Sequence, residues 1–151
     1  MRPPALWYLV WVLTAGYGGI GFAQDQTPAE AEAIQRVIEA QLNAFAADDA
    51  EQAFSLATPG IRDLFSSAET FLTMVRNGYP MVYRHLSIRF LTPRMGNHFS
   101  LQMVRMTDTG ADVWMVVYRL RKQDDGRWLI DGVTAFPGAP VPDLAPATRG
   151  S

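Results

Sequence analysis

Residues 76–90 read RNGYPMVYRHLSIRF, and the spacing of the apolar residues changes within this stretch. Before Pro80, apolar residues recur at the three- and four-residue spacing of a helix. From Leu86 onward they alternate with polar residues, as in a strand. We expect Gly78 to end a helix in the left-handed conformation and Pro80 to keep the chain extended. The stretch is therefore predicted to be a hinge between helices and a sheet.

The chain before the hinge carries signals for three helices. Thr27 is the expected N-cap of the first, with Pro28 in its first turn and Glu30 completing a capping box. One face of this helix is a largely apolar stripe, expected to be buried, that consists of Ile34, Val37, Ile38, Gln41, Leu42 and Phe45. TPG at 58–60 is expected to stop the second, shorter helix.

The chain after the hinge predicts four antiparallel strands. The longest strand reads ADVWMVVYRLRK (111–122), and the last reads GRWLIDGVTAF (126–136). TDTG (107–110) and QDDG (123–126) are typical of hairpin turns, and PRMGN (93–97) is a third predicted turn. Helices followed by an antiparallel meander indicate an α+β domain.

The first residues of the chain predict export. Arg2 precedes an apolar run from Ala5 to Ala15, and small residues around Ala23 suit a signal peptidase. We predict a signal peptide at 1–23, a domain at 24–136, a Pro-rich disordered tail at 137–151, and a periplasmic or secreted protein. The alternative is an uncleaved leader that tethers the domain to the membrane.

The amino-acid composition argues against several functions. The 151 residues include no cysteine, which excludes disulfides, thiol catalysis and thiolate metal sites. The net charge is −2, with an acidic front half and a mildly basic back half. This balance argues against a nucleic-acid partner, because such domains are usually basic.

The central strands are apolar on both faces. In an antiparallel sheet with one solvent-exposed face, apolar and polar residues should alternate more regularly along each strand. Helices can cover only one side. We therefore expect the far side to pair with a second copy of the chain, through Val104, Met115, Val117 and Val133.

Two motifs support a resemblance to a known family. Ala57 to Ile61 (ATPGI) and Gly78 to Arg84 (GYPMVYR) resemble a bacterial family, the domain of unknown function 4864, and the similarity covers about Ala33 to Val133. The resemblance implies an exported bacterial protein with the cystatin-like, nuclear-transport-factor-2-like fold. In that fold, helices pack on the concave face of a curved antiparallel sheet. It brings no established reaction and no catalytic residues, and the wider fold serves many functions.

Metal and cofactor sites are not predicted. His85 and His98 have no nearby carboxylate at ligand spacing. The sequence contains no G-x-S-x-G elbow, no P-loop and no dinucleotide glycine pattern. We predict neither a metal nor a phosphate-bearing cofactor.

Proton transfer by a buried carboxylate is the enzymatic alternative. Asp112 and Asp131 belong to aromatic-rich strands, where desolvation can raise a carboxyl pKa, and Tyr118 could donate to an oxyanion. We favour the structural interpretation, with Asp112 in solvent beside a turn. Asp131 is then expected to pair with Arg89 or Arg119 on the outer face.

Other side chains are candidates for ligand binding, although packing explains each of them. They are Tyr79, Tyr83, Arg84, His85, Trp114, Tyr118 and Trp128. Among them, Arg84 and His85 could form an anion-binding rim at a pocket mouth.

The sequence as a whole favours a non-catalytic binding or assembly module with a cavity for a small apolar ligand. The competing hypothesis is an isomerase, dehydratase or cyclase that uses a buried carboxylate.

Overall fold

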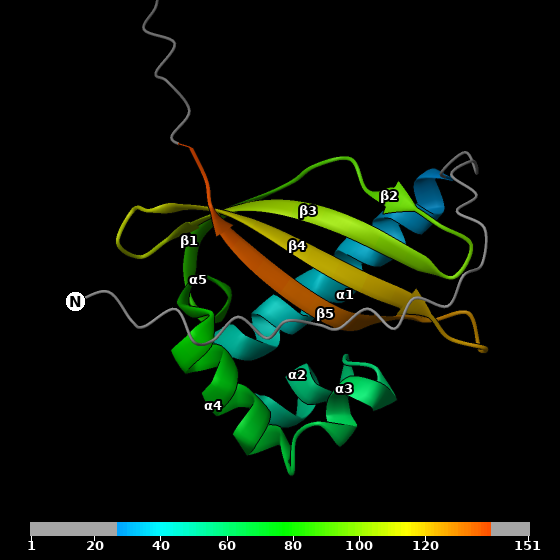
Figure 1. The fold of residues 1–151 in the computed structure, drawn as a ribbon, viewed down its shortest axis with the longest axis horizontal. Helices are drawn as coiled ribbons and strands as arrows, with labels where there is room; N and C mark the ends of the chain where they lie inside the picture. Colours follow the sequence, from blue (N-terminus) through cyan, green and yellow to red (C-terminus); the bar gives the residue numbers. More distant parts are fainter. Residues whose placement is uncertain (1–26, 140–151) are drawn as a thin grey trace, which may run out of the picture.

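The computed structural model describes residues 27–139, which form a helical layer packed against one antiparallel sheet (Figure 1). The helices in this range are α1 (Pro28–Ala46), α2 (Ala50–Ser55), α3 (Pro59–Asp63), α4 (Ala68–Gly78) and α5 (Pro80–Tyr83). The strands are β1 (His85–Phe90), β2 (Arg94–Met95), β3 (Phe99–Asp108), β4 (Val113–Lys122) and β5 (Trp128–Pro137). The predicted α+β class is confirmed. The predicted leader and most of the predicted tail lie outside the described residues.

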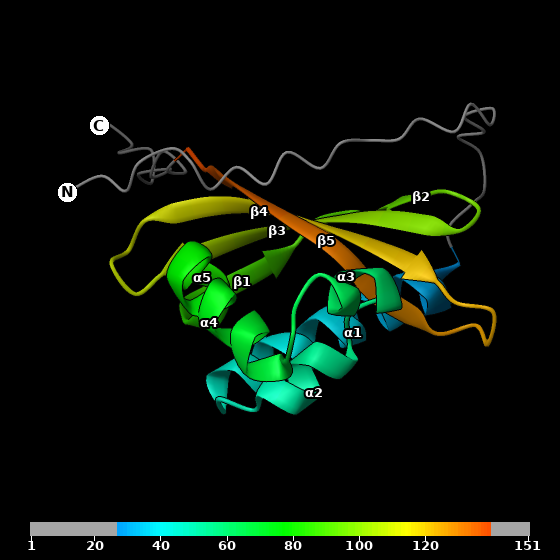
Figure 2. The ribbon, with the colours of Figure 1, turned by 60° about the horizontal axis from the view of Figure 1, so that its bottom comes forward.

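All the helices lie on one side of the sheet, and α1 crosses its strands diagonally (Figure 2). The sheet order is β1-β3-β4-β5, and β2 also pairs with β3. The expectation of four strands is wrong by one, because two residues of the predicted turn at 93–97 pair with Leu101 and Ser100 as β2. No helix within residues 27–139 is long and apolar enough to cross a membrane.

The helix starts follow their sequence signals. The hydroxyl of Thr27 accepts a hydrogen bond from the Glu30 amide at 3.3 Å, as expected for an N-cap. Thr58 has the same role at the start of α3, where Pro59 occupies the first turn. The TPG motif therefore starts a helix as well as ending one, because proline fits the first helical position.

The hinge differs from the expectation in two ways. Gly78 is the last residue of α4 and has no positive φ; Tyr79, at φ −134° and ψ 61°, caps the helix. Pro80 does not keep the chain extended but opens the short helix α5. The physical reason is again that proline is preorganised for a first helical turn.

The core lies between α1 and the inner face of the sheet. Ile34 and Ile38 of α1 are fully buried, and so is the row of β4 side chains that follows Trp114 on the inner face. That row consists of Val116, Tyr118 and Leu120, and all three have no exposed surface.

A bulge in β5 changes which face each side chain of the strand occupies. Arg119 pairs with Gly132 and Leu120 pairs with Ile130, so Asp131 is an extra residue in the ladder. One extra residue reverses the alternation beyond it. Val133 therefore faces the helices and packs against the core, and the prediction that it lies on the outer face is wrong.

Val104 is also not on the outer face. It is fully buried opposite Val116, because β3 turns Ser100, Gln102, Val104 and Met106 toward the helices. The alternation of β3 was ambiguous, since apolar residues occupy both of its faces. The outer face contains Met103, Met115, Val117 and Phe136, which are joined by the pairs Met103–Val117 and Met115–Phe136. We call these four residues the outer patch.

Candidate functional site

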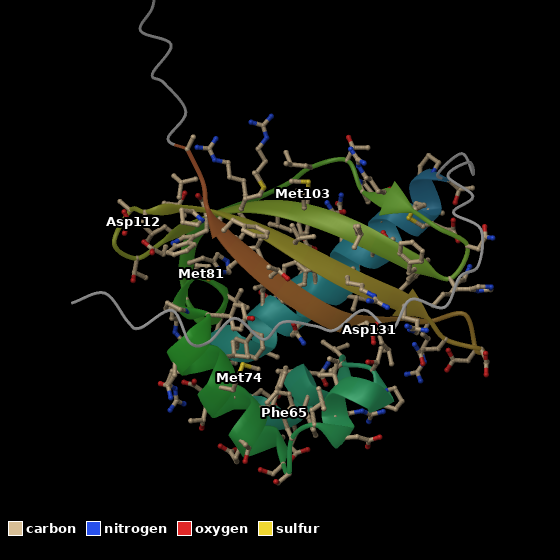
Figure 3. All side chains as sticks on the ribbon, viewed as in Figure 1. Phe65, Met74, Met81, Met103, Asp112 and Asp131 are labelled. Carbon is tan, nitrogen blue, oxygen red and sulfur yellow. The ribbon has the colours of Figure 1, made fainter. Side chains whose placement is uncertain are left out.

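A cavity of about 60 Å³ lies between the helical layer and the inner face of β5. Most of its lining is apolar. The lining residues are Gln41, Phe45, Ala57, Ile61, Leu64, Phe65, Phe71, Met74, Val75, Tyr79, Val82, Ile130, Gly132 and Val133. Figure 3 shows Phe65 and Met74 on the helical side of the molecule, away from Asp112 at the β3–β4 turn.

The helices hold this lining through an aromatic cluster around Phe71. Its ring centre lies 6.0 Å from that of Phe45 and 5.4 Å from those of Phe54 and Phe65. Contacts at these distances fix α1, α2 and α4 relative to one another. Leu64 lines the cavity and is nevertheless 60% exposed, so the cavity reaches the surface beside α3.

Gln41 supplies one polar group to the cavity. Its side chain is 2% exposed, and its Nε2 donates a hydrogen bond to the Ala53 carbonyl at 3.1 Å. The sequence places Gln41 on the apolar stripe of the first helix but did not mark it as a site residue. A polar side chain on an otherwise apolar stripe was the signal that could have identified it.

Tyr79 supplies the second polar group, and it is the one predicted ligand-binding residue that lines the cavity. Its hydroxyl donates to the Val133 carbonyl at 3.3 Å. Burial raises the pKa of Tyr79 because the phenolate would lose its hydration. The hydroxyl therefore stays protonated at neutral pH.

The rest of the hinge forms an ionic cluster away from the cavity lining. Asp48, at φ 53°, accepts hydrogen bonds from the Tyr83 hydroxyl and from Arg84, whose Nη2 lies 3.1 Å from Oδ2. Arg84 also donates to the Phe45 carbonyl at 2.6 Å, and its guanidinium lies 4.0 Å from the centre of the Tyr83 ring. These contacts join the end of α1 to the hinge. The Tyr83 hydrogen bond, followed by the Arg84 charge, lowers the pKa of Asp48.

The expected anion-binding rim is not formed at the cavity. Neither Arg84 nor His85 belongs to its lining, because Arg84 is held by Asp48 and Phe45. Nδ1 of His85 is buried without a partner among residues 27–139, and burial lowers the pKa of this imidazole. Two residues of 76–90 line the cavity, Tyr79 and Val82, and the hinge interpretation accounts for the stretch apart from this contribution.

Asp131 lies at the bulge, outside the cavity lining. Its carboxylate is 3.2 Å from Nε of Arg119 and 3.5 Å from Nη2 of Arg121, and it accepts a hydrogen bond from the Thr58 hydroxyl at 2.8 Å. Of the two expected partners, Arg89 and Arg119, the structure shows Arg119. Asp131 thus connects the start of α3 to the sheet.

Asp112 is exposed in the β3–β4 turn, as the structural interpretation expected. Its amide donates to the carboxylate of Asp108 at 2.9 Å, and Trp114 Nε1 donates to the same carboxylate at 2.9 Å. Trp128 is buried, with Nζ of Lys122 5.8 Å from its ring centre. None of these side chains lines the cavity.

Tyr118 lies on the inner face of β4, outside the cavity lining. It is fully buried, its hydroxyl has no partner within the described part of the chain, and burial strongly raises its pKa. Ser100 Oγ and Gln102 Oε1 on the neighbouring β3 are likewise buried and unpartnered among residues 27–139. Of these three residues, Tyr118 was a candidate from the sequence, whereas Ser100 and Gln102 were not.

Metal ligands are not grouped in the part of the chain that the structure describes. Between residues 27 and 139, no three His, Cys, Asp or Glu side chains lie together in a way that could hold a metal ion.

Comparison with solved structures relates the fold to known proteins. The ketosteroid isomerase-like protein from Erwinia carotovora atroseptica SCRI1043 aligns with a TM-score of 0.52 at 13% identity, over 76% of this chain and all of that one. An NTF-2 like protein of unknown function from Burkholderia xenovorans LB400 aligns with a TM-score of 0.46 at 12% identity, over 74% of this chain and 89% of that one. A search among curated proteins finds no match.

The model of one sequence family, described as a domain of unknown function (DUF4864), matches residues 27–140. The match covers the whole helical layer and sheet. The chain therefore belongs to this DUF4864 family and has the fold of the nuclear-transport-factor-2-like superfamily.

Proposed function

We propose that this domain is a non-catalytic binding module whose cavity holds a small, largely apolar ligand. The observation that carries the proposal is the composition of the lining, in which Gln41 and Tyr79 are the polar side chains and no side chain is ionisable at neutral pH. Such a cavity can bind apolar surface and orient it through two polar groups. It offers no general base for proton transfer.

The size of the cavity limits what it can enclose. Its 60 Å³ exceeds the ~10–15 Å³ that one water molecule requires and is smaller than the ~150 Å³ of a cavity that binds benzene. A ligand of a few heavy atoms therefore fits inside. A longer ligand would extend past the exposed Leu64 beside α3.

A pair of matched substitutions tests the cavity. Ala57 and Ala53 are both fully buried, but only Ala57 lines the cavity. Leucine at position 57 should fill the space and stabilise the fold or leave its stability unchanged. Leucine at position 53 should overpack the core and destabilise it by about 1–3 kcal/mol. Equal destabilisation by Ala57→Leu and Ala53→Leu would count against the cavity.

Binding itself is tested by native mass spectrometry of the protein purified from its host. The proposal expects a retained small molecule that is absent from Ala57→Leu. The same spectrum reports the mass of the mature chain, and hence whether the leader is removed after Ala23. Export to the periplasm stays a prediction that this measurement checks.

The enzymatic alternative requires a carboxylate that faces the ligand. Asp131 instead contacts Arg119, Arg121 and Thr58, and Asp112 is exposed. The similarity to a ketosteroid isomerase-like protein suggests isomerisation as the reaction to assay, although a likeness at 13% identity shows the fold alone. Isomerase activity that disappears in Asp131→Asn would replace our proposal with the enzymatic one.

Self-association through the outer face of the sheet also stays a prediction. Met115 and Val117 keep their expected place in it, and Met103 and Phe136 replace Val104 and Val133. Met103 and Phe136 are 37% and 49% exposed there. Static light scattering should give the mass of a dimer for the parent protein and of a monomer for Val117→Lys. A monomeric parent at tens of micromolar would remove the prediction.

A further inference from the structure

We infer that the outer face of the sheet binds the surface of an anionic phospholipid bilayer, through the outer patch and the arginines that border it. This site is separate from the proposed function, because the cavity lies between the helices and the inner face of β5. Its occupant is identified by the charges and the apolar side chains that the sheet turns away from the helices.

Arg89 and Arg105 form a cross-strand pair of like charge on the outer face. Arg105 lies between the fully buried Val104 and Met106 on β3, so its side chain points away from the helices. Arg89 is directly opposite it on β1 and shares that face. Like charges in opposite positions destabilise a sheet. Among residues 27–139, neither arginine has an ion pair with a carboxylate, so an external anion would relieve the repulsion.

Arg119 and Arg121 provide a contrast on the same face. Both contact the carboxylate of Asp131, at 3.2 Å and 3.5 Å. Arg94 is exposed opposite Leu101 on the outer face and, within the described part of the chain, has no ion pair. The sheet therefore neutralises the arginines of β4 internally and leaves those of β1, β2 and β3 to an external anion.

These arginines border the apolar outer patch. Arg105 is directly opposite Met115 in the β3–β4 ladder, and Met115 is directly opposite Phe136 in the β4–β5 ladder. Met103 and Phe136 are 37% and 49% exposed. Exposed apolar side chains bordered by arginines suit the interface of a bilayer. The apolar atoms can enter the acyl boundary, and the guanidinium groups can bind lipid phosphates.

The charge of the helical layer would orient the molecule on such a surface. The five helices contain six carboxylates and three arginines, whereas the strands turn five arginines and one carboxylate outward. The charged helix residues are Glu30, Glu32, Glu39, Glu51, Asp63 and Glu69, and Arg36, Arg62 and Arg76. An anionic surface therefore attracts the outer face and repels the helices.

An anionic bilayer fits this face better than an acidic protein does. No described helix covers the face (Figure 2), and its unpaired arginines are spread over β1, β2 and β3. A bilayer presents phosphates across its whole surface and can contact all three arginines together. A protein would need carboxylates at matching positions. A second copy would need the outer patch alone, so substitution of the arginines separates the two occupants.

Co-sedimentation with lipid vesicles tests the bilayer directly, with the protein purified from its host and kept at sub-micromolar concentration. One set of vesicles is phosphatidylcholine, and the other is an equal mixture with anionic phosphatidylglycerol. Binding to the anionic vesicles should be at least about tenfold tighter and should weaken as salt is added, because salt screens surface charge. A retained leader would insert into both kinds of vesicle, so the difference between them reports the charge-dependent binding.

Arg105→Gln should weaken binding to the anionic vesicles about fivefold, the usual contribution of one arginine near such a surface. Its thermal stability should not fall, because the substitution removes a like-charge contact. The matched control is Arg36→Gln, which makes the same change of charge on α1, where Arg36 is paired with Glu32. The control should bind within about twofold of the parent. Arg89→Gln repeats the test at the second position, should Arg105→Gln fail to fold.

Three results would overturn the inference. The first is equal binding to the two kinds of vesicle, or binding to neither, which would leave an acidic protein as the partner to seek. The second is an equal loss in Arg105→Gln and Arg36→Gln, because net charge alone would then explain the binding. The third is a change in the mass measured by light scattering for Arg105→Gln, because the arginine would then belong to an interface between copies.

Discussion

The two faces of the sheet are built from similar side chains and lie in different surroundings. On β3, Met106 of the inner face is fully buried, and Met103, three residues away on the outer face, is 37% exposed. The helices cover only the inner face (Figure 2). The apolar character of a strand therefore does not decide whether its side chains are buried, because burial depends on the layer packed against each face.

Alanine substitutions of the two methionines should differ most in their effect on stability. Met106→Ala should lower the free energy of unfolding by about 2–5 kcal/mol, because it leaves a cavity in the core. At concentrations where the protein is monomeric, Met103→Ala should change it by less than about 0.5 kcal/mol, as is usual at the surface. Urea-induced unfolding followed by tryptophan fluorescence measures both. A large, concentration-dependent loss for Met103→Ala would mean that the outer face is buried between two copies.

A smaller effect is expected at the bulge, where a polar side chain of β5 joins the sheet to α3. Asp131→Ala leaves the 3%-exposed Thr58 without its hydrogen-bond acceptor and should destabilise the fold by about 1–3 kcal/mol. The control is Asp125→Ala, whose ion pair with Arg127 is exposed on both sides and should contribute little to stability. Denaturant unfolding of both variants checks this difference, and equal losses would contradict the role given to the bulge.

Two tyrosines on the inner side, Tyr118 and Tyr79, differ in whether their hydroxyl has a hydrogen-bond partner. Tyr118→Phe removes a buried hydroxyl without a partner among residues 27–139, so stability should stay constant or rise by up to about 1 kcal/mol. Tyr79→Phe removes the bond to Val133 and should lower stability by about 1 kcal/mol. Thermal unfolding of the two variants reports the sign. A loss for Tyr118→Phe would indicate that a bound water or ligand satisfies its hydroxyl.

The smallest effect concerns the hinge between the two layers. The hydrogen bond from Tyr83 and the Arg84 charge hold the folded-state pKa of Asp48 below its ordinary value, so its contribution to stability is present above the unfolded pKa. The contribution is lost as the pH falls through the folded pKa. The stability difference between the parent and Asp48→Asn should therefore shrink as the pH falls below about 4. Urea midpoints of both proteins between pH 7 and pH 3 test this, and a constant difference would contradict it.

Local signals in the sequence were enough for the order and type of most elements. Thr27 and Pro28 indicate the start of α1, and the change of period after Pro80 indicates the passage from helices to strands. The expectation that Asp131 pairs with Arg89 or Arg119 also followed from alternation along the strands, and the structure shows the pairing with Arg119. Each of these inferences uses residues that lie close together along the chain or in one ladder.

The tertiary structure decided which face Val104 and Val133 occupy and where the cavity lies. A bulge of one residue at Asp131 reverses the alternation of β5 beyond it, and no local pattern marks that residue as unpaired. The cavity depends on how α1, α4 and β5 pack, and only this packing brings Gln41 and Tyr79 to one space. Periodicity is a property of neighbouring residues, whereas strand phase and enclosed volume arise from contacts between distant ones.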